Sequence, residues 1–140
     1  MIGIVVATHG DLGRALIAAM EMILGEQELV LALSLHVSDR LEDAAERLEG
    51  AVREADAGDG VLILTDMLGG TPSNMSLALI GGDRPVDVVS GANLPMLLKA
   101  AQARRERGLA ETAAAVRRHG RAAILVASEV LAGGEKDERA

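Results

Sequence analysis

Short apolar runs alternate with helical patterns along the whole chain, and this alternation restricts the fold more than any other feature. Five runs are predicted to be strands: 2–7, 29–35, 61–65, 86–90 and 122–128. The first four are continuously apolar rather than alternating, which is typical of strands that are covered on both faces. The order of elements therefore predicts an α/β fold, with an open, doubly wound parallel sheet and helices on both faces.

Capping residues and glycines mark the helices between these runs. Thr71 followed by a proline predicts a helix start, because Thr caps helices and Pro suits the first turn. Gly120 after a basic turn predicts a helix end. The expected helices cover 12–24, a stretch that starts at 39, 71 to about 81, about 93–108, and 109–119. The run 122–128 follows as a last strand, so residues 1–131 are predicted to form one domain and 132–140 a polar tail.

Composition excludes several classes of function. The chain has no Phe, Tyr or Trp, which excludes base-stacking nucleic-acid surfaces and aromatic grooves for proline-rich peptides. Its 21 acidic and 14 basic residues give a net charge of −7, which repels nucleic acid and anionic membranes. It has no cysteine, which excludes disulfides, thiolate catalysis and cysteine-bound metals. The apolar start at 2–7 has no basic region before it, which predicts a buried strand of a cytosolic protein.

Two polar residues follow predicted strands at the edge where doubly wound sheets bind ligands. His9 comes after the first strand and Asp66 directly after the third. If these strands are neighbours, the two side chains can form a hydrogen bond. A carboxylate that accepts the proton of one imidazole nitrogen leaves the lone pair of the other nitrogen free. The pair therefore predicts a nucleophilic or basic histidine.

The loop after Asp66 adds an anion site to this histidine. Gly69 and Gly70 let the backbone approach a ligand closely, and Thr71 opens a helix whose first amides can bind phosphate. Histidine, carboxylate and anion cradle together indicate phosphoryl transfer through phosphohistidine. The chain has no Gly-Lys-Ser/Thr motif of the kind that holds nucleotide phosphates, and we expect neither a bound cofactor nor a metal.

Structural interpretations stand beside these functional ones. A lone histidine after a strand is more often a satisfied polar residue, and a Gly-Gly-Thr-Pro turn can simply begin a helix. His36 follows the second strand and either lines the same cleft or lies at its rim, whereas His119 is interpreted as a cation at a helix end. The basic run 104–107 is either a solvated helix end or a docking patch. Met67 and Leu68 form an exposed apolar pair that would suit a protein partner.

Four motifs in order resemble the IIA domain of the mannose family of the bacterial phosphoenolpyruvate-dependent sugar phosphotransferase system (PTS). They are GIVVATHG (3–10), AMEMILGEQ (19–27), LTDMLGGTPSN (64–74) and SGANLPML (90–97). The resemblance implies a cytoplasmic phosphocarrier. It would accept a phosphoryl group from the histidine-containing phosphocarrier protein and pass it to a IIB component, which phosphorylates sugar during transport. Contact with the membrane would be indirect, through the sugar permease.

The resemblance also assigns roles to residues. His9 matches the phosphorylated position, with the ring nitrogen distal to the side-chain attachment as acceptor, and Asp66 matches the residue that orients it. Thr71, with the loop residues Leu68, Gly69 and Gly70, matches the phosphoryl-binding positions. The family fold has parallel strands in the order 2-1-3-4. It adds an antiparallel last strand, exchanged between the subunits of a homodimer, which would be 122–128 here.

Other interpretations of the same motifs stay open. Mannose-type proteins often join IIA to IIB, whereas this chain ends in a short polar tail, so a IIB partner is expected to be a separate protein or missing. The domain could then serve a regulatory phosphorelay that moves no sugar, or sense an anion without transferring it. The phosphocarrier subunit of dihydroxyacetone kinases has a similar domain, but the loop 69–74 and the segment 93–96 favour the mannose type.

Overall fold

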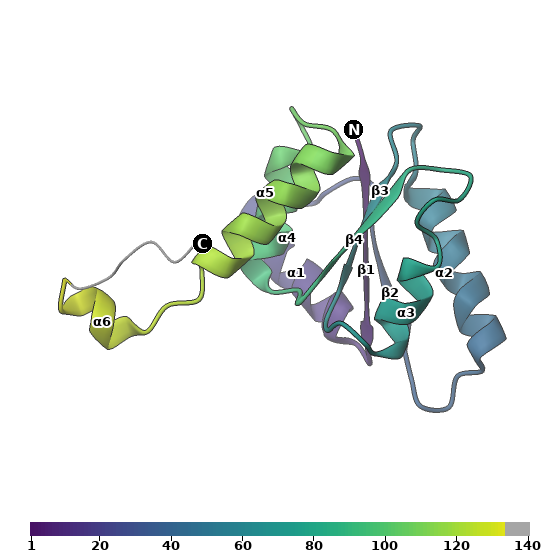
Figure 1. Ribbon diagram of the computed structural model, residues 1–140, viewed down its shortest axis with the longest axis horizontal. Coiled ribbons are helices and arrows are strands. Elements are labelled where there is room, and N and C mark those ends of the chain that lie inside the picture. Colours follow the sequence, from purple (N-terminus) through teal and green to yellow (C-terminus); the bar gives the residue numbers. More distant parts are fainter. Residues whose placement is uncertain (134–140) are drawn as a thin grey trace.

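The computed structural model describes residues 1–133 of the chain. Strands and helices alternate through most of this range, as the apolar runs predict (Figure 1). The elements are β1 (Gly3–His9), α1 (Leu12–Leu24), β2 (Val30–Leu35), α2 (Leu41–Ala55), β3 (Val61–Thr65), α3 (Thr71–Leu77), β4 (Val86–Ser90), α4 (Leu94–Ala103), α5 (Leu109–Ala122) and α6 (Ala127–Leu131). No helix within the described residues combines the length and the apolar character needed to cross a membrane.

The four strands form one sheet in the order β2-β1-β3-β4, and every neighbouring pair is parallel. This order is the expected one, and it confirms the α/β fold with helices on both faces. Helices α1, α4 and α5 lie on one side of the sheet, and α2 and α3 on the other (Figure 1). The carboxyl ends of all four strands therefore meet at one edge.

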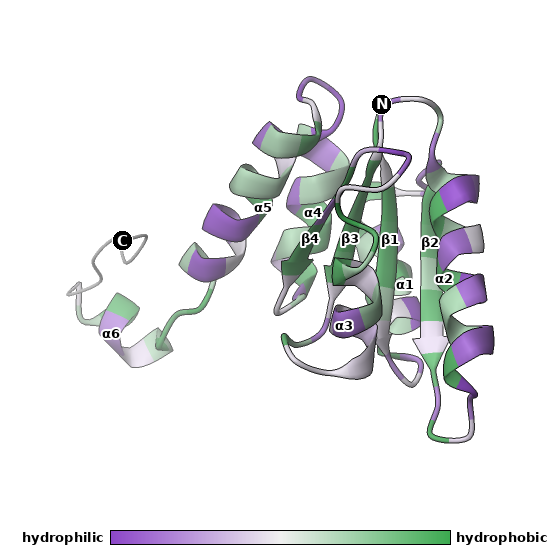
Figure 2. Cartoon of the chain, turned by 45° about the vertical axis from the view of Figure 1, so that its right-hand side comes forward, coloured by the Kyte–Doolittle hydropathy of each residue, from purple (hydrophilic) through white to green (hydrophobic). Residues whose placement is uncertain are grey.

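Alternate residues of the strands supply two apolar cores, one on each face of the sheet. In β1, Ile4 and Val6 pack with α1, α4 and α5, whereas Val5 and Ala7 pack with α2 and α3. Figure 2 shows the strands in the green of apolar residues and polar residues on the outer faces of the helices. Continuous apolar runs are therefore strands buried on both faces, and β1 ends where the polar residue His9 reaches solvent.

Several helix ends differ from the expected ones: α3 ends at Leu77 instead of about 81, and α4 ends at Ala103 instead of 108. Gly70, not Thr71, is the N-cap of α3, and Thr71 is the first helical residue. Helix α5 continues past Gly120 to Ala122, because Gly120 is used for close packing rather than for termination. A Cβ atom at Gly120 would overlap the side chain of Met96 on α4, so only glycine lets the two helices approach this closely.

The last predicted strand is wrong for the single chain. Of the run 122–128, Ala122 ends α5, the next residues leave the body of the molecule, and Ala127 begins α6 (Figure 1). A strand needs a neighbour for its backbone N–H and C=O groups, and the chain does not bring this segment to the sheet. Of the predicted polar tail 132–140, residues 134–140 lie outside the described residues.

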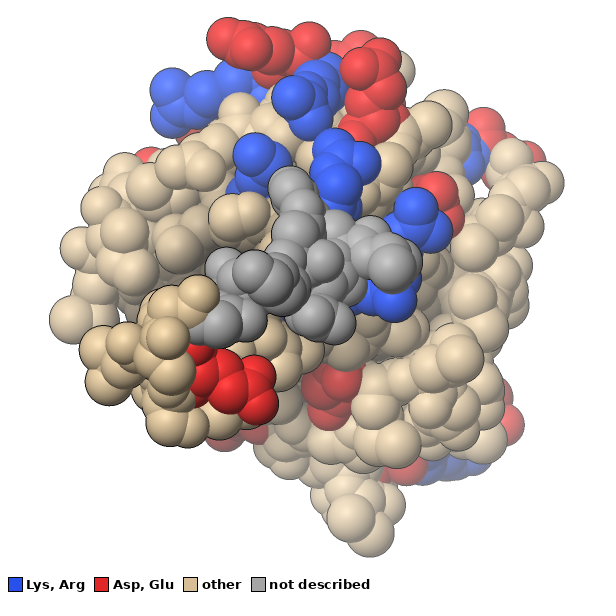
Figure 3. All heavy atoms as spheres, turned by 60° about the vertical axis from the view of Figure 1, so that its left-hand side comes forward, with Lys and Arg blue, Asp and Glu red and all other residues tan. Residues whose placement is uncertain are grey.

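The basic run 104–107 also differs from a solvated helix end. The side chain of Arg104 is only 2% exposed, and its guanidinium donates hydrogen bonds to the backbone carbonyls of Ile2 at 3.1 Å and Glu28 at 2.6 Å. It therefore ties the end of α4 to the chain before β1 and before β2. Arg105 and Arg107 are exposed, and Figure 3 shows basic side chains on the face of the molecule that carries α5.

Replacing Arg104 by Ala is expected to lower the free energy of unfolding by about 2–4 kcal/mol, because it leaves one buried and one part-buried carbonyl group without their donors. Urea denaturation followed by circular dichroism measures the change. Arg105→Ala is the matched control, since Arg105 is exposed, and it should leave stability within about 0.5 kcal/mol of the parent. Equal losses for the two variants would contradict the structural role of Arg104.

Candidate active site

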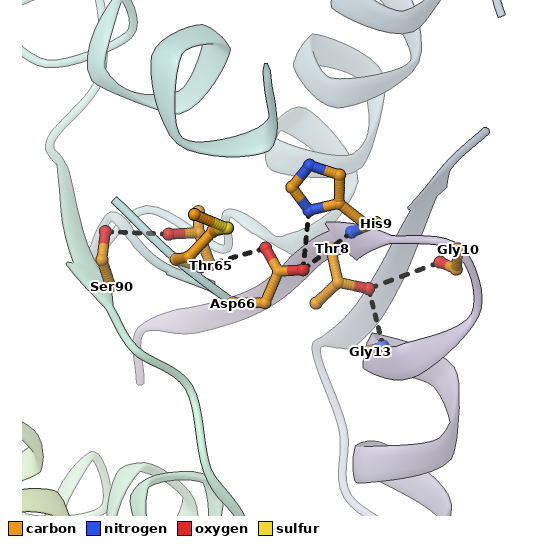
Figure 4. Close-up of polar contacts among 8 residues, drawn as sticks. Thr8, His9, Gly10, Gly13, Thr65, Asp66 and Ser90 are labelled. Carbon is orange, nitrogen blue, oxygen red and sulfur yellow. Dashed lines mark hydrogen bonds and ion pairs between the residues drawn. The ribbon is translucent and has the colours of Figure 1, made fainter. Parts of the chain in front are cut away.

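His9 and Asp66 meet at the carboxyl edge of the sheet. His9 ends β1, and Asp66 follows β3, the strand that pairs with β1. The His9 Nδ1 atom lies 2.8 Å from Oδ2 of Asp66, and the same oxygen accepts the His9 backbone N–H at 3.0 Å. Figure 4 shows the Nδ1 edge of the imidazole facing the carboxylate and the opposite edge pointing away from it. The structure therefore brings together the two residues predicted to form a pair.

The ionisation of Asp66 decides which tautomer this contact holds. Partial burial raises the pKa of Asp66, but hydrogen bonds from the side chain and the amide of His9 outweigh it and lower the pKa below its usual range. Asp66 is therefore a carboxylate at neutral pH and can only accept, so the neutral ring carries its proton on Nδ1. The lone pair of Nε2 is then free. This stabilising pair is fully present above about pH 4 and is lost as the pH falls through the lowered pKa.

The backbone on which His9 sits is held by the residue before it. The Thr8 side chain is fully buried; its Oγ1 accepts the Gly13 backbone N–H at 2.8 Å and donates to the Gly10 carbonyl at 3.4 Å (Figure 4). A Cβ atom at Gly13 would lie 2.8 Å from the Val6 carbonyl oxygen, so α1 starts in direct contact with β1. The turn after His9 is thus fixed to the strand and to the first helix.

The loop between β3 and α3 lies against the free nitrogen of His9. A Cβ atom at Gly70 would lie 2.7 Å from Cε1 and 3.1 Å from Nε2 of His9, so a side chain at this position would press on the imidazole. Within residues 1–133 the backbone amides of Leu68, Gly69, Gly70 and Thr71 donate no hydrogen bond. Leu68, Gly69 and Thr71 are exposed, and Gly70 is half-buried. The loop therefore offers unpaired donors beside Nε2 of His9, as an anion-binding loop does.

A cavity of about 450 Å³ opens beside His9. It is lined by His9, Gly10, Leu35, His36, Val37, Asp39, Leu41, Ala44 and Thr71. His36 and Thr71 thus share this cavity with His9. Neither Val37 nor Leu41 was predicted for this site. Residues that follow parallel strands share one edge of the sheet, which is the rule that leads to His9 and Asp66, and the same rule applies to the end of β2.

Asp39 has a different role from the helix start expected of it. The helix begins at Leu41, and the Asp39 carboxylate accepts the His36 backbone N–H at 2.8 Å and a hydrogen bond from Arg47 at 3.3 Å. The bond from the His36 amide is the largest influence on Asp39 and holds its pKa below the usual range. Asp39 therefore shapes the turn after β2 as an ionised side chain.

The site contains exposed apolar side chains as well as polar ones. Met67 and Leu68 are exposed in the loop after β3, as predicted; Val37 is exposed in the turn after β2, and Leu41 at the start of α2. Within the part of the chain that the structure describes, no three His, Cys, Asp or Glu side chains gather as they would around a metal ion.

Comparison with known proteins identifies the family. A family model described as the PTS system fructose IIA component (EIIA-man) matches residues 3–117. The chain belongs to the mannose family of PTS IIA components. It is 32% identical over 99 residues to the fructose-specific EIIA component of Bacillus subtilis, covering 71% of this chain and 68% of that protein. It is 34% identical over 103 residues to the mannose-specific EIIAB component of Escherichia coli, covering 74% of this chain but only 32% of that protein.

Solved structures agree with this assignment. The EIIA component from Streptococcus agalactiae superposes with a TM-score of 0.84 at 30% identity, covering 91% of this chain and 98% of that one. The mannose/sorbose IIA subunit from Enterococcus faecalis gives 0.81 at 28% identity, covering 89% and 93%. The family resemblance seen in the four motifs is therefore confirmed. IIA components of the PTS are phosphotransferases, and the chain has the role of a phosphocarrier in that system.

Replacing Asp66 by Asn is expected to change the tautomer of His9. The neutral amide offers a donor as well as an acceptor at the position of the carboxylate, so the Nε2–H form becomes more populated. Nitrogen-15 chemical shifts of the imidazole at pH 8 measure the two forms directly. A parent ring that is already mainly Nε2–H, or an unchanged tautomer ratio in the variant, would contradict the orienting role of Asp66.

Proposed function

We propose that His9 is the phosphorylated residue of this IIA component, acting in the cytoplasm between the histidine-containing phosphocarrier protein and a IIB component. The contact between His9 Nδ1 and Asp66 carries the proposal, because it presents the Nε2 lone pair as the acceptor. This lone pair attacks the phosphorus of the donor phosphohistidine and forms an N–P bond. The donor N–P bond breaks, and its electron pair returns to the donor imidazole. The IIB component takes the group in the same way for sugar transport.

The loop after β3 supports this assignment by its position. The unpaired amides of Leu68, Gly69, Gly70 and Thr71 supply donors to phosphoryl oxygens, and the Thr71 hydroxyl lies at the cavity that His9 faces. Because these donors are backbone amides, no side chain has to be reoriented when the charged phosphoryl group arrives. Asp66 meanwhile stabilises the ring while Nε2 carries the phosphoryl group, since it accepts the Nδ1 proton throughout.

Protein partners fit the surroundings of His9 better than a small substrate does. The His9 side chain is 53% exposed, so another protein can reach Nε2 without an opening motion. Met67, Leu68, Val37 and Leu41 are exposed around it, and such apolar groups beside a reactive side chain are typical of a docking surface. We therefore assign this edge of the sheet to both the phosphoryl donor and the IIB acceptor.

Radiolabelled phosphoenolpyruvate, the first enzyme of the system and the histidine-containing phosphocarrier protein test the proposal together. The parent chain should become labelled with a phosphate that is labile to acid and stable to alkali. His9→Ala should lose all label while keeping its fold, and Asp66→Asn should be labelled more slowly, because fewer rings present the lone pair on Nε2. His119→Ala is the matched control, because His119 is an exposed residue of α5.

Each other outcome has a definite meaning. Label on both the parent and His9→Ala would place the phosphoryl group on a different histidine. No label on the parent would instead favour a regulator that senses an anion on the same fold. Equal rates for Asp66→Asn and the parent would remove Asp66 from the mechanism.

The proposed carrier is a homodimer in which the segment 122–128 pairs with the sheet of the other subunit. Ile124, Leu125 and Val126 are between 55% and 75% exposed, and Figure 2 shows this segment as apolar where it leaves α5. Strand β4 ends the sheet, and a hollow of about 420 Å³ lies between it and α5. An added antiparallel strand would cover that edge and the apolar segment together.

Sedimentation equilibrium of the full chain is expected to give twice the monomer mass of 14.5 kDa. Ile124→Asp should shift the protein to the monomer, because it places a charge in the apolar pairing segment. Met22→Asp is the control, since Met22 is also exposed, at 88%, but lies on α1. A monomeric parent would exclude the exchanged strand at the concentrations measured.

A further inference from the structure

His36 extends the candidate active site beyond the pair and the loop. His36 follows β2 directly. The Gly10 backbone N–H donates to the Leu35 carbonyl at 2.6 Å, so the turn after His9 is joined to the end of β2, next to His36. Both histidines line the same cavity of about 450 Å³. The His36 Nε2 atom lies 3.7 Å from Oδ1 of Asp11, the residue before α1, so the ring reaches the turn that follows His9.

The His36 imidazole is available for a new contact. Its side chain is 51% exposed, and neither ring nitrogen makes a hydrogen bond within residues 1–133. The separation of 3.7 Å from Asp11 is an ion-pair distance but too long for a hydrogen bond. Asp39 engages only the backbone of His36: its carboxylate accepts the His36 N–H at 2.8 Å, and its own N–H donates to the His36 carbonyl at 3.0 Å, so the turn is held without use of the ring.

The charges around the cavity favour a cation at this position. Asp39 and Asp66 are ionised there, and Asp11 is nearby. Arg47 reaches this region through Asp39, to which it is already bonded. Among the described residues that line the cavity, His36 is the only side chain besides His9 that can take up a positive charge. A phosphoryl group brings up to two further negative charges, which these carboxylates repel.

We infer that His36 is a phosphoryl-binding residue, whose protonated ring contacts the phosphoryl group carried by His9. The inference rests on the proposed phosphorylation of His9. Only the protonated ring is a cation, so the contact forms when His36 is protonated and is lost when the ring gives up that proton. Phosphorylation and proton binding at His36 then favour one another, because binding free energies are reciprocal.

The test is the equilibrium between the phosphorylated donor and this full-length chain, measured with radiolabel from pH 6.0 to 8.5. His36→Gln keeps a polar side chain without charge, and His36→Lys keeps a charge throughout this range. At pH 6.0 His36→Gln should carry about threefold to fivefold less phosphoryl group at equilibrium, the size of an exposed ion pair, and at pH 8.5 it should match the parent. His36→Lys should carry more phosphoryl group at equilibrium than His36→Gln at both pH values, because its charge is present throughout.

His119→Gln is the matched control and should follow the parent at every pH. Thermal unfolding of all variants checks that the fold is unchanged. A His36→Gln profile that runs parallel to the parent from pH 6.0 to 8.5 would overturn the inference while leaving His9 as the carrier. A parent chain that takes no label at all would instead refute the phosphocarrier proposal, so the two failures are distinguishable.

Discussion

The parallel pairing of β1 with β3 is the contact on which the candidate site depends. Its register places Ala7 opposite Thr65, the last residue of β3, so Asp66 follows this pair by one residue and His9 by two, and the two side chains meet. Both strands are central in the sheet and buried on both faces, so a slip in register would force both close-packed cores to repack. The stability of the whole core thus holds the two side chains at hydrogen-bonding distance. A carboxylate at this point decides the tautomer of the imidazole, and no further group is needed to free Nε2.

The site combines parts of different rigidity. His9 is the last residue of a buried strand, and Thr8 fastens the following turn to α1 through a buried hydroxyl. The loop on the other side has glycines at 69 and 70 and amides that no described residue uses. Gly69 has a positive φ of 93°, which favours glycine, whereas at Gly70 the absence of a side chain keeps the imidazole of His9 in its position. A rigid nucleophile facing exposed donors fits a group that must bind and leave repeatedly.

Much of this arrangement could be predicted from the sequence, and the failures have physical causes. Continuous apolar runs predict parallel strands correctly, since a strand buried on both faces must be apolar throughout. The edge rule then predicts that His9 and Asp66 meet, because it depends only on strand direction. Gly120 was predicted wrongly because a glycine after a basic turn looks the same whether it ends a helix or makes room for another side chain, here Met96. Arg104 resembled a surface residue for a similar reason: its partners are the carbonyls of Ile2 and Glu28, distant in the sequence and invisible to local patterns.

The segment 122–128 shows a different limit. Its apolar character predicts burial, yet within one chain it reaches no edge of the sheet and its apolar residues stay exposed. A pattern reports only that a segment must be covered, and not by which chain. The same holds for Met67 and Leu68 beside His9, whose exposure has no use in an isolated domain. Two groups of apolar side chains that the fold leaves uncovered, one at the edge that carries His9 and one after α5, lie where the proposed carrier would meet its partners and the proposed dimer its second subunit.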